Sequence, residues 1–289
     1  MKYEVQEKDK GLSIQEVLKR RLGFSTRLLR KLKREGGVTV NKESKWLNEK
    51  VKKYDVIEVT FPKEENHFTS QSISFSVSYE DEDLLILDKP PGIVVHPTKG
   101  HPDGTIANGL MKYMQDHGET FKIRFVNRLD MDTSGLLIVA KNAYAQEELV
   151  KQMSKGILKK RYLAIVEGQV AEEKGTIDLP IGIEDEEKIG RAVMADGAPS
   201  VTHFQVVKRL KGNHTLLSLL LETGRTHQIR VHLSHMGYPI EGDLLYGGKQ
   251  ERINRQALHA VSLTFLHPRS REEITVTADI PLDMKELME

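Results

Sequence analysis

Apolar residues recur at helical spacing in two segments near the start of the chain. Ser13 and Glu16 have the spacing of a capping box, in which each side chain bonds the backbone amide of the other residue, so a helix begins here. Ser25 can cap a second helix, which Gly36 and Gly37 end. Each segment carries one apolar face, formed by Val17, Leu18 and Leu22 and by Leu28, Leu29 and Leu32. The pattern predicts two short helices, and the alternation after them predicts strands at 38–40 and 56–61.

Strand patterns dominate the rest of the chain and do not alternate strictly with helices. Apolar runs predict strands at 73–79, 84–88, 135–140, 162–167, 201–208, 215–222 and 274–278. Helical spacing occurs at 106–117, 143–155 and 226–237. We therefore expect an N-terminal domain at 1–62, a polar linker at 63–73, and an α+β domain at 74–289 with a mixed, largely antiparallel sheet.

The composition is typical of a soluble globular protein, with 38% hydrophobic and 29% charged residues. No apolar run approaches the roughly 18 residues of a membrane span, and the N-terminus lacks the apolar stretch of a signal peptide. The absence of cysteine excludes disulfides and thiolate metal sites and suits a reducing cytoplasm. We expect a cytoplasmic protein with no membrane partner, and a monomer, because no pattern indicates an obligate dimer.

The net charge of +1 hides an asymmetry along the chain. Residues 1–62 carry 16 Lys and Arg against 9 Asp and Glu, and the remainder carries 27 against 33. Residues 19–34 hold eight basic residues and no acidic one, although like charges on neighbouring helical turns repel. RNA phosphates would offset that repulsion. We therefore expect RNA contacts from Arg20, Arg21, Arg27, Arg30, Lys31, Lys33 and Arg34; a solvated helix face is the alternative.

Four segments carry groups suited to catalysis. They are Asn127–Asp130, which puts a carboxylate just before an apolar strand; Asp88–Pro97, a strand ending in a Pro-Gly turn; Lys159–Val166, with Tyr162 beside three cations; and Glu222–His232, which carries two arginines. Each has an ordinary structural explanation, since turns, packed tyrosines and paired arginines are common. A carboxylate beside a rigid strand can, however, be held still, as catalysis requires.

These segments contain three motifs, in this order: Lys89-Pro-Pro-Gly-Ile-Val-Val-His-Pro97, Arg128-Leu-Asp-Met-Asp-Thr-Ser-Gly135 and Gly224-Arg-Thr-His-Gln-Ile-Arg-Val-His232. Together they resemble the RluA-type pseudouridine synthases, which isomerise uridine in ribosomal or transfer RNA, over about residues 75–289. The basic region, about residues 11–62, resembles the αL RNA-binding module named after a small-subunit ribosomal protein, the S-four-like domain. One departure is Asn127, where many members have histidine, and we expect it to affect loop contacts more than chemistry.

The resemblance implies the pseudouridine synthase fold and a role for each of five residues. Asp130 would be the catalytic aspartate and Arg230 its partner, while Tyr162 would pack against the target base and assist proton removal. Arg128 would fill the gap left by the extruded nucleotide, and Ile229 would line the pocket. No cofactor and no metal is implied, because the isomerisation involves no redox change. The partner would be RNA, with large-subunit (23S) ribosomal RNA preferred and transfer RNA the alternative.

The chemistry of a carboxylate agrees with these roles. It can act on the sugar by attacking the anomeric carbon or by removing a sugar proton, and the sequence leaves both routes open. Burial alone would neutralise an aspartate, so we expect Arg230 within hydrogen-bond reach of Asp130 to keep it ionised. Loss of that arginine would leave a lone buried charge. We also expect a positive surface to converge on the site, formed by Arg128, Lys159, Lys160 and Arg161.

Three other interpretations stand beside this one. Asp130 and Asp132 have the spacing of the nucleophile motif of haloacid-dehalogenase-type phosphatases, but polar residues precede them here. His227, His232 and His235 suggest metal ligands, although their spacing does not put all three on one helical face and nearby arginines repel a cation. The third interpretation is a non-catalytic RNA-binding scaffold. Outside these segments, we expect the acidic stretch at 184–187 to be an exposed loop.

Overall fold

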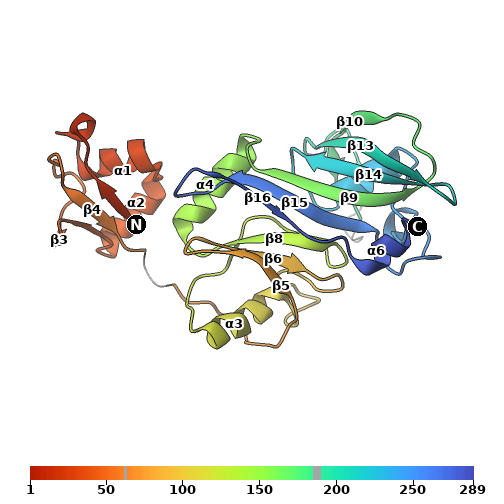
Figure 1. The fold of residues 1–289 in the computed structure, drawn as a ribbon, viewed down its shortest axis with the longest axis horizontal. Helices are drawn as coiled ribbons and strands as arrows, with labels where there is room; N and C mark the ends of the chain where they lie inside the picture. Colours follow the sequence, from red (N-terminus) through yellow and green to blue (C-terminus); the bar gives the residue numbers. More distant parts are fainter. Residues whose placement is uncertain (62–63, 185–189) are drawn as a thin grey trace.

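The computed structural model describes residues 1–61, 64–184 and 190–289. At one end of the molecule, in red and orange in Figure 1, α1 (Ile14–Leu22) and α2 (Thr26–Arg34) pack on a small sheet. Its strands, in order across the sheet, are β1 (Lys2–Glu4), β4 (Val56–Val59), β2 (Val38–Val40) and β3 (Glu43–Ser44). Both helices begin at the predicted serines, because Ser13 forms a capping box with Glu16 and Ser25 accepts from the amide of Leu28.

In the described residues, the larger part of the chain is built on one 10-stranded sheet in which only the β15–β8 pair is parallel. Its strands, across the sheet, are β10 (Lys174–Asp178), β13 (Val201–Leu210), β14 (His214–Leu221), β9 (Lys159–Glu167), β15 (Leu258–Leu266), β8 (Ser134–Ala140), β6 (Leu84–Lys89) and β5 (Ser76–Glu80), with β16 (Glu273–Thr277) on β15 and β7 (Arg124–Phe125) on β8. A separate pair is formed by β11 (Ile181–Gly182) and β12 (Ala192–Val193). The predicted α+β class with a largely antiparallel sheet is confirmed. The acidic stretch at 184–187 lies outside the described residues except for Glu184.

Strand β15 joins the two halves of the large sheet, and the sequence pattern did not predict it. It also missed β10. The start of β15 pairs with β8 through Ala260 and Gly135, and with β9 through Ala260 and Tyr162. Gly135, at a φ of +109°, permits this approach, because a Cβ there would lie 2.3 Å from the carbonyl oxygen of Ala260. The strand therefore brings β9 close to the loop that precedes β8.

Helices cover the sheet and its ends. They are α3 (Ile106–His117), α4 (Ala143–Ser154), α5 (Gln228–His235) and α6 (Leu282–Glu286), with the 3₁₀ turn η2 (Leu244–Tyr246); the 3₁₀ turn η1 (Glu7–Asp9) belongs to the N-terminal module. In Figure 1, α3 lies beside β5 and β6, and α4 lies between the sheet and the N-terminal module. Helix α5 is shorter than the predicted 226–237, because His227 before it and Gly237 after it adopt positive φ. Within the described ranges, no helix is long and apolar enough to cross a membrane.

Helix α4 holds the N-terminal module. Tyr144 on α4 is 2% exposed and belongs to the hydrophobic cluster of the module, with its ring centre 4.8 Å from that of Phe24. Lys151 Nζ donates to the carbonyl oxygen of Gly23 at 2.6 Å. The turn between α1 and α2 therefore packs directly on the larger domain.

The connection after the module is irregular but firmly attached. Asn66 donates to the carbonyl oxygen of Phe121 at 2.7 Å. Glu64 pairs with Lys31 of α2 at 2.6 Å and also with Arg124 of β7. Residues 64–73 contain no helix or strand, as expected of a linker, yet these bonds tie them to both domains.

Candidate active site

Asp130 lies in the loop between β7 and β8, and a buried asparagine shapes that loop. Asn127 donates from Nδ2 to the carbonyl oxygen of Leu136 at 3.1 Å, and its Oδ1 accepts from the amide of Ile138 at 2.8 Å. Both partners belong to β8, so the loop is tied to the strand that follows it. Asn127 thus contacts the backbone of β8, and the expectation that it affects loop contacts more than chemistry stays a prediction.

A buried lysine ties the same loop to the end of β6. Lys89 has no exposed surface, and its Nζ donates to the carbonyl oxygens of Pro90 at 2.7 Å, Ile93 at 2.9 Å and Met131 at 2.7 Å. Three acceptors match the three protons of an ammonium group. Because Met131 follows Asp130, this bond holds the backbone next to the carboxylate in place.

Arg230 on α5 lies between two carboxylates. Its Nη1 is 3.2 Å from Asp130 Oδ2, so the predicted pairing is present. Its Nε and Nη2 donate to the two oxygens of Asp243 at 2.7 and 2.8 Å, a bidentate pair that the sequence did not predict. Burial alone would lower the pKa of Arg230, but Asp243 and then Asp130 raise it, so the guanidinium stays charged. The side chain of Asp243 is 1% exposed and that of Asp130 is 26% exposed, so Asp130 is the carboxylate that a substrate can reach.

His227 faces Asp130 from the turn before α5. The hydroxyl of Tyr246 accepts the amide N–H of Arg191 at 2.9 Å and shares a hydrogen bond of 2.7 Å with His227 Nδ1. The other ring nitrogen, Nε2, lies 3.9 Å from Asp130 Oδ2. Burial lowers the pKa of His227, so the ring is neutral.

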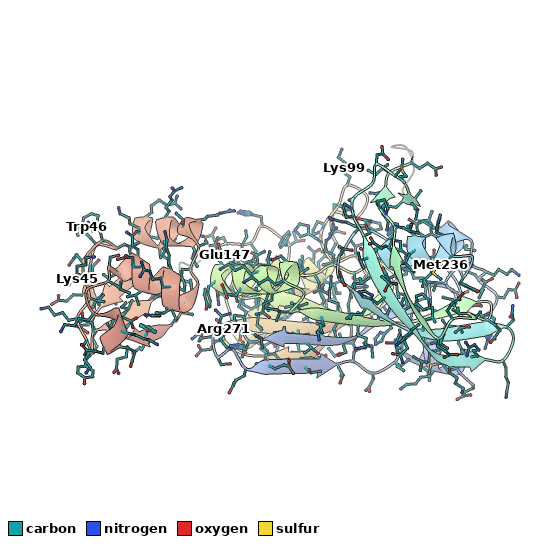
Figure 2. The ribbon with its side chains drawn as sticks, turned by 90° about the horizontal axis from the view of Figure 1, so that it is seen from above. Lys45, Trp46, Lys99, Glu147, Met236 and Arg271 are labelled. Carbon is teal, nitrogen blue, oxygen red and sulfur yellow. The ribbon has the colours of Figure 1, made fainter. Side chains whose placement is uncertain are left out.

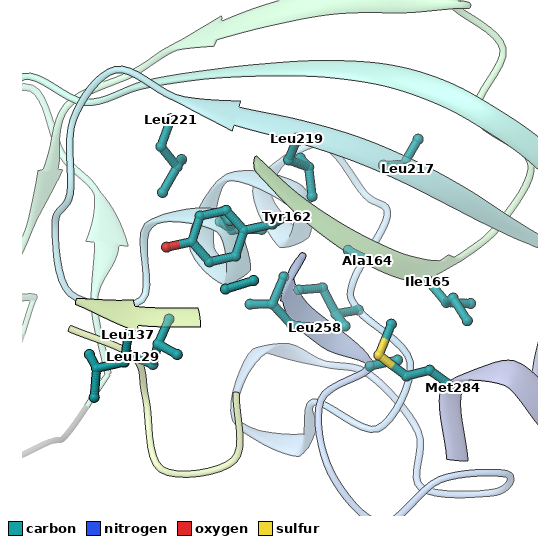
Figure 3. Packing of buried hydrophobic residues seen from close by; sticks show 14 of the residues in the cluster. Leu129, Leu137, Tyr162, Ala164, Ile165, Leu217, Leu219, Leu221, Leu258 and Met284 are labelled. Atoms are coloured by element: carbon teal, nitrogen blue, oxygen red, sulfur yellow. The ribbon is translucent and has the colours of Figure 1, made fainter. Parts of the chain in front are cut away.

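Tyr162 on β9 presents its hydroxyl at the edge of the hydrophobic core. Figure 3 shows its ring among Leu219, Leu221 and Leu258, with the oxygen pointing out of the cluster. Burial, and then the charge of Asp130, raises the pKa of Tyr162 far above its ordinary value. The side chain is therefore a neutral phenol at physiological pH.

The expected convergence of four cations is wrong for two of them. Side chains alternate along β9, so Lys160 is buried on the face of Tyr162 while Lys159 and Arg161 are exposed on the other face. Lys160 is 5% exposed, burial lowers its pKa, and no described residue pairs with it. Arg128 is exposed at the mouth of the site and also has no ion-pair partner in the described ranges. Of the four cations expected to converge, two therefore face the site, Lys160 buried and Arg128 exposed.

A cleft of about 640 Å³ joins these groups, a size typical of ligand sites. All five residues with a predicted role line it, together with two further polar groups described above: Asp130, Tyr162, Arg230, Arg128, Ile229, Lys160 and His227. Ile229 is 4% exposed and belongs to the core as well as to the wall. The structure therefore brings the predicted residues together from the β7–β8 loop, β9 and α5.

The family described as RNA pseudouridylate synthase matches residues 83–235, more than half of the chain and all three catalytic candidates. The chain belongs to this family. A second family, described as the RluD ribosomal pseudouridine synthase N-terminal domain, matches residues 1–57 of the synthase. Family membership replaces the phosphatase interpretation of Asp130 and Asp132.

Relatives of this synthase extend over most of its length. The Bacillus subtilis (strain 168) protein called uncharacterized RNA pseudouridine synthase YjbO is 41% identical over 270 residues, 92% of this chain and 95% of the relative. Ribosomal large subunit pseudouridine synthase D of Escherichia coli (strain K12) is 40% identical over 240 residues, 78% of this chain and 73% of the relative. The solved structure of human RNA pseudouridylate synthase domain containing 1 superposes with a TM-score of 0.59 at 29% identity, covering 73% of this chain and 85% of that chain. The protein is an RNA pseudouridine synthase, an isomerase with the pseudouridine synthase fold.

Two residues of this site, Asp243 and Tyr246, were not predicted from the sequence. Both come from the loop around η2, which carries no strand or helix pattern. The signal that marks the loop is its glycines: a Cβ on Gly242 would lie 2.0 Å from the carbonyl oxygen of Arg255, and one on Gly248 would lie 2.0 Å from that of Ile240. Asp243 lies between two glycines at which a side chain has no room, so its loop is tightly packed. This packing places the carboxylate of Asp243 beside Arg230.

Hydrogen bonds within the protein engage two of the three histidines considered as metal ligands. His232 bonds Thr202 Oγ1 at 2.9 Å through Nδ1 and the carbonyl oxygen of Leu179 at 2.9 Å through Nε2. His227 bonds Tyr246 through Nδ1. The described part of the chain holds no group of three or more candidate metal ligands.

The basic residues of the N-terminal module do not form one uniform face. Four of the seven expected to contact RNA pair with carboxylates: Arg20 with Glu16, Arg21 with Asp9, Lys31 with Glu64, and Arg34 with Glu35. The carboxylate of Asp9 has no exposed surface, so Arg21 compensates a buried charge within the module. Within residues 1–61, 64–184 and 190–289, Arg27, Arg30 and Lys33 form no ion pair. Charge spacing in the sequence indicates the pair Arg20–Glu16, and Arg34 is adjacent to Glu35, but spacing does not indicate Arg21–Asp9 and Lys31–Glu64, whose partners are distant in the sequence.

Proposed function

We propose that this synthase converts uridine to pseudouridine in large-subunit ribosomal RNA, with Asp130 as its catalytic carboxylate. The observation that carries the proposal is the 3.2 Å contact between Arg230 Nη1 and Asp130 Oδ2, in a cleft that also presents Tyr162. A partly exposed carboxylate beside a charged guanidinium is suited to act on a sugar that enters the cleft. The name of the Escherichia coli relative, 40% identical, supports this class of RNA.

The reaction requires the carboxylate to be ionised when the nucleotide arrives. The bond between ribose C1′ and uracil N1 breaks, and a bond between C1′ and C5 forms. The proton on C5 is lost and N1 gains one, so the atoms balance without an oxidant or a reductant. Asp130 either attacks C1′ or removes a sugar proton to give a glycal, and each route begins from the carboxylate. Arg230 stabilises that form, and the nucleotide itself excludes water from the remaining open side of Asp130.

The neighbours of Asp130 are suited to hold an extruded nucleotide. Tyr162 is a neutral phenol and hence a weak base, which favours packing against the uracil over removal of its proton. Lys160 is a buried cation without a protein partner in the described residues, so an anion in the cleft, such as the phosphate of that nucleotide, compensates its charge. Ile229 gives the base an apolar wall. Arg128, exposed at the rim, takes the place of the flipped base in the RNA.

The N-terminal module supplies affinity for the RNA backbone in this proposal. Its sequence carries the charge excess of the chain, and its unpaired cations face solvent. The full enzyme acts as a monomer in the cytoplasm, where ribosomal RNA is assembled. Transfer RNA is the alternative substrate, because the cleft holds one nucleotide and does not read the rest of the molecule.

Tritium release tests the function directly. RNA labelled with tritium at C5 of uridine loses the label to water when C5 becomes the glycosidic carbon. We expect release from a large-subunit ribosomal RNA transcript and none from transfer RNA transcripts, with pseudouridine found at the labelled positions. Release from transfer RNA alone would show that transfer RNA, and not ribosomal RNA, is the substrate. Release from neither RNA would favour the non-catalytic scaffold.

A further inference from the structure

We infer that the N-terminal module holds an unpaired nucleotide of the RNA in a groove formed by Lys19, Arg30, Lys33 and Trp46, with the base stacked on Trp46. We call this site the Trp46 groove. It deepens the proposed function and rests on it, because that function supplies the RNA. The groove is separate from the cleft at Asp130, since none of its residues lines that cleft.

Trp46 is a large aromatic side chain held out of the core by an ordered loop. It is 68% exposed, although Leu47 beside it is buried in the core of the module. The amide of Trp46 donates to Glu49 Oε1 at 2.7 Å, and the amide of Gln15 on α1 donates to the carbonyl oxygen of Leu47 at 2.9 Å. The exposure of the ring is therefore fixed by the backbone, as expected of a stacking platform and not of a frayed terminus.

Charge around the ring is complementary to a nucleotide. Lys33 Nζ lies 5.6 Å from the centre of the indole ring, and Lys19 and Arg30 line the same groove. No carboxylate of the described residues pairs with any of these three cations, whereas Arg20, Arg21, Lys31 and Arg34 of the same helices are all paired. Three of the four cations of α1 and α2 that form no ion pair within the described residues thus gather at the aromatic ring, and only Arg27 lies outside the groove lining. Phosphates would meet Lys19 and Arg30 while the base meets Trp46.

The shape of the groove fits the same occupant. Its volume is about 720 Å³, within the range of ligand clefts. The one carboxylate among its lining residues, Glu49, accepts the amide of Trp46 and forms an ion pair with none of the three cations. A stacked aromatic surface flanked by cations binds any base with little preference, because every base offers a π face. The Trp46 groove therefore adds affinity for single-stranded RNA and not sequence recognition.

The position of the groove defines what it contributes. Figure 2 shows Trp46 at the outer end of the module, on the opposite side from Glu147 of α4, where the module meets the larger domain. RNA bound there lies away from the nucleotide that enters the cleft. The groove holds a second point of the substrate and should affect binding without affecting the chemical step.

Intrinsic fluorescence provides a direct test, because Trp46 is the only tryptophan of the chain. The full-length protein is titrated with a short single-stranded oligoadenylate, and with inorganic polyphosphate as an anion without bases. Stacking quenches indole emission, so we expect oligoadenylate to quench Trp46 and polyphosphate to bind without quenching. The double variant R30A/K33A should need about tenfold more oligoadenylate for half quenching. K2A/K10A removes the same charge from exposed residues of the module outside the groove, and should shift the midpoint by less than about twofold.

Activity separates this site from the catalytic one. With the ribosomal RNA transcript, W46A should raise KM about tenfold and leave kcat unchanged, because stacking of a base on the indole ring acts on binding alone. Tyr54→Ala is the matched control, since Tyr54 is 67% exposed in the same module with Lys53 Nζ 4.8 Å from its ring centre. Absence of quenching by oligoadenylate, equal quenching by polyphosphate, or an unchanged KM in W46A would each overturn the inference. A wild-type enzyme without tritium release would instead overturn the proposed function, and the fluorescence titration would still report on the groove.

Discussion

At the scale of single residues, the site depends on how Arg230 divides its hydrogen bonds. The bidentate pair with buried Asp243 fixes the guanidinium, and the remaining Nη1 reaches Asp130. The charge that stabilises Asp130, the proposed catalytic carboxylate, is thus held by a second carboxylate that is buried away from the cleft. Loss of Arg230 would leave the charge of Asp243 buried without a partner. The sequence analysis expected Asp130 to be that buried charge, but Asp130 is partly exposed.

Replacement of Arg230 by leucine should therefore lower both activity and stability, for different reasons. Tritium release is lost because Asp130 loses its partner, and the free energy of unfolding falls by about 3–5 kcal/mol because Asp243 is left charged and buried. The double variant Arg230→Leu with Asp243→Asn should recover most of that stability, measured by urea denaturation, and none of the activity. Recovery of activity in the double variant would show that Asp130 works without the guanidinium.

Acid should reveal the burial of His259, which bonds Ser134 Oγ at 2.9 Å where β15 meets β8. Burial, with the charge of Arg255, lowers the pKa of His259 from 6.5 to about 4. The unfolded chain therefore takes up this proton near pH 6.5 and the folded chain only near pH 4, so stability present above pH 6.5 is lost as the pH falls to about 4. The loss is about 3 kcal/mol. The free energy of unfolding of wild type minus that of His259→Leu should fall across this window, and a constant difference would contradict the shift.

At the scale of elements, the parallel pairing of β8 with β15 places Asp130 near Tyr162. Gly135 lets the two strands approach, and β15 then pairs with β9 beside Tyr162. The motif that begins with Arg128 therefore contains both the carboxylate, Asp130, and the glycine that permits the close pairing of β8 with β15, Gly135.

A methyl group at position 135, where β8 and β15 pair, should lower the stability of the protein. Gly135→Ala puts a Cβ 2.3 Å from a backbone oxygen at a φ of +109°, so the strands must separate. We expect a loss of more than about 3 kcal/mol by urea denaturation, above the usual range for single substitutions. Gly156→Ala is the control, because Gly156 has a φ of +66° but open space around it, and it should cost about 1 kcal/mol. Equal losses would show that the conformation, and not the close approach, requires glycine at 135.

The features that depend on residues close in sequence were predicted better than those that depend on packing between distant segments. The caps at Ser13 and Ser25 were readable because capping involves residues three positions apart. Strand β15 was missed because its first residues are buried whatever face they occupy, including His259, so its pattern is neither alternating nor purely apolar. Asp130, Tyr162 and Arg230 were found through motif resemblance. Asp243 was not, since its place beside Arg230 depends on the packing of the η2 loop.

At the scale of the whole molecule, the synthase combines a neutral-to-acidic catalytic domain with a basic module that packs on α4 through Tyr144. The irregular residues 64–73 add bonds to both sides, so the module is positioned with respect to the cleft and not tethered loosely. The proposed function assigns binding of the RNA backbone and chemistry on one uridine to separate domains.

Deletion of residues 1–62 should separate these two tasks. The larger domain keeps its own hydrophobic clusters and should remain folded, although Tyr144 becomes exposed. RNA affinity should fall, and the slope of log affinity against log salt should decrease by about 0.7–0.9 for each phosphate that the truncated protein no longer neutralises. Circular dichroism checks the fold of the truncated protein. An unchanged salt slope in a folded truncation would reject the module as the main binding surface for the RNA backbone.

The central claim is that the carboxylate of Asp130 performs the chemistry, and one pair of variants tests it most directly. Asp130→Asn and Asp132→Asn each remove one negative charge, two positions apart, and of these two aspartates only Asp130 contacts Arg230. The account predicts that tritium release from the ribosomal RNA transcript disappears in Asp130→Asn, with RNA affinity nearly unchanged, and persists in Asp132→Asn. Release by Asp130→Asn at more than a few per cent of the wild-type rate would contradict it.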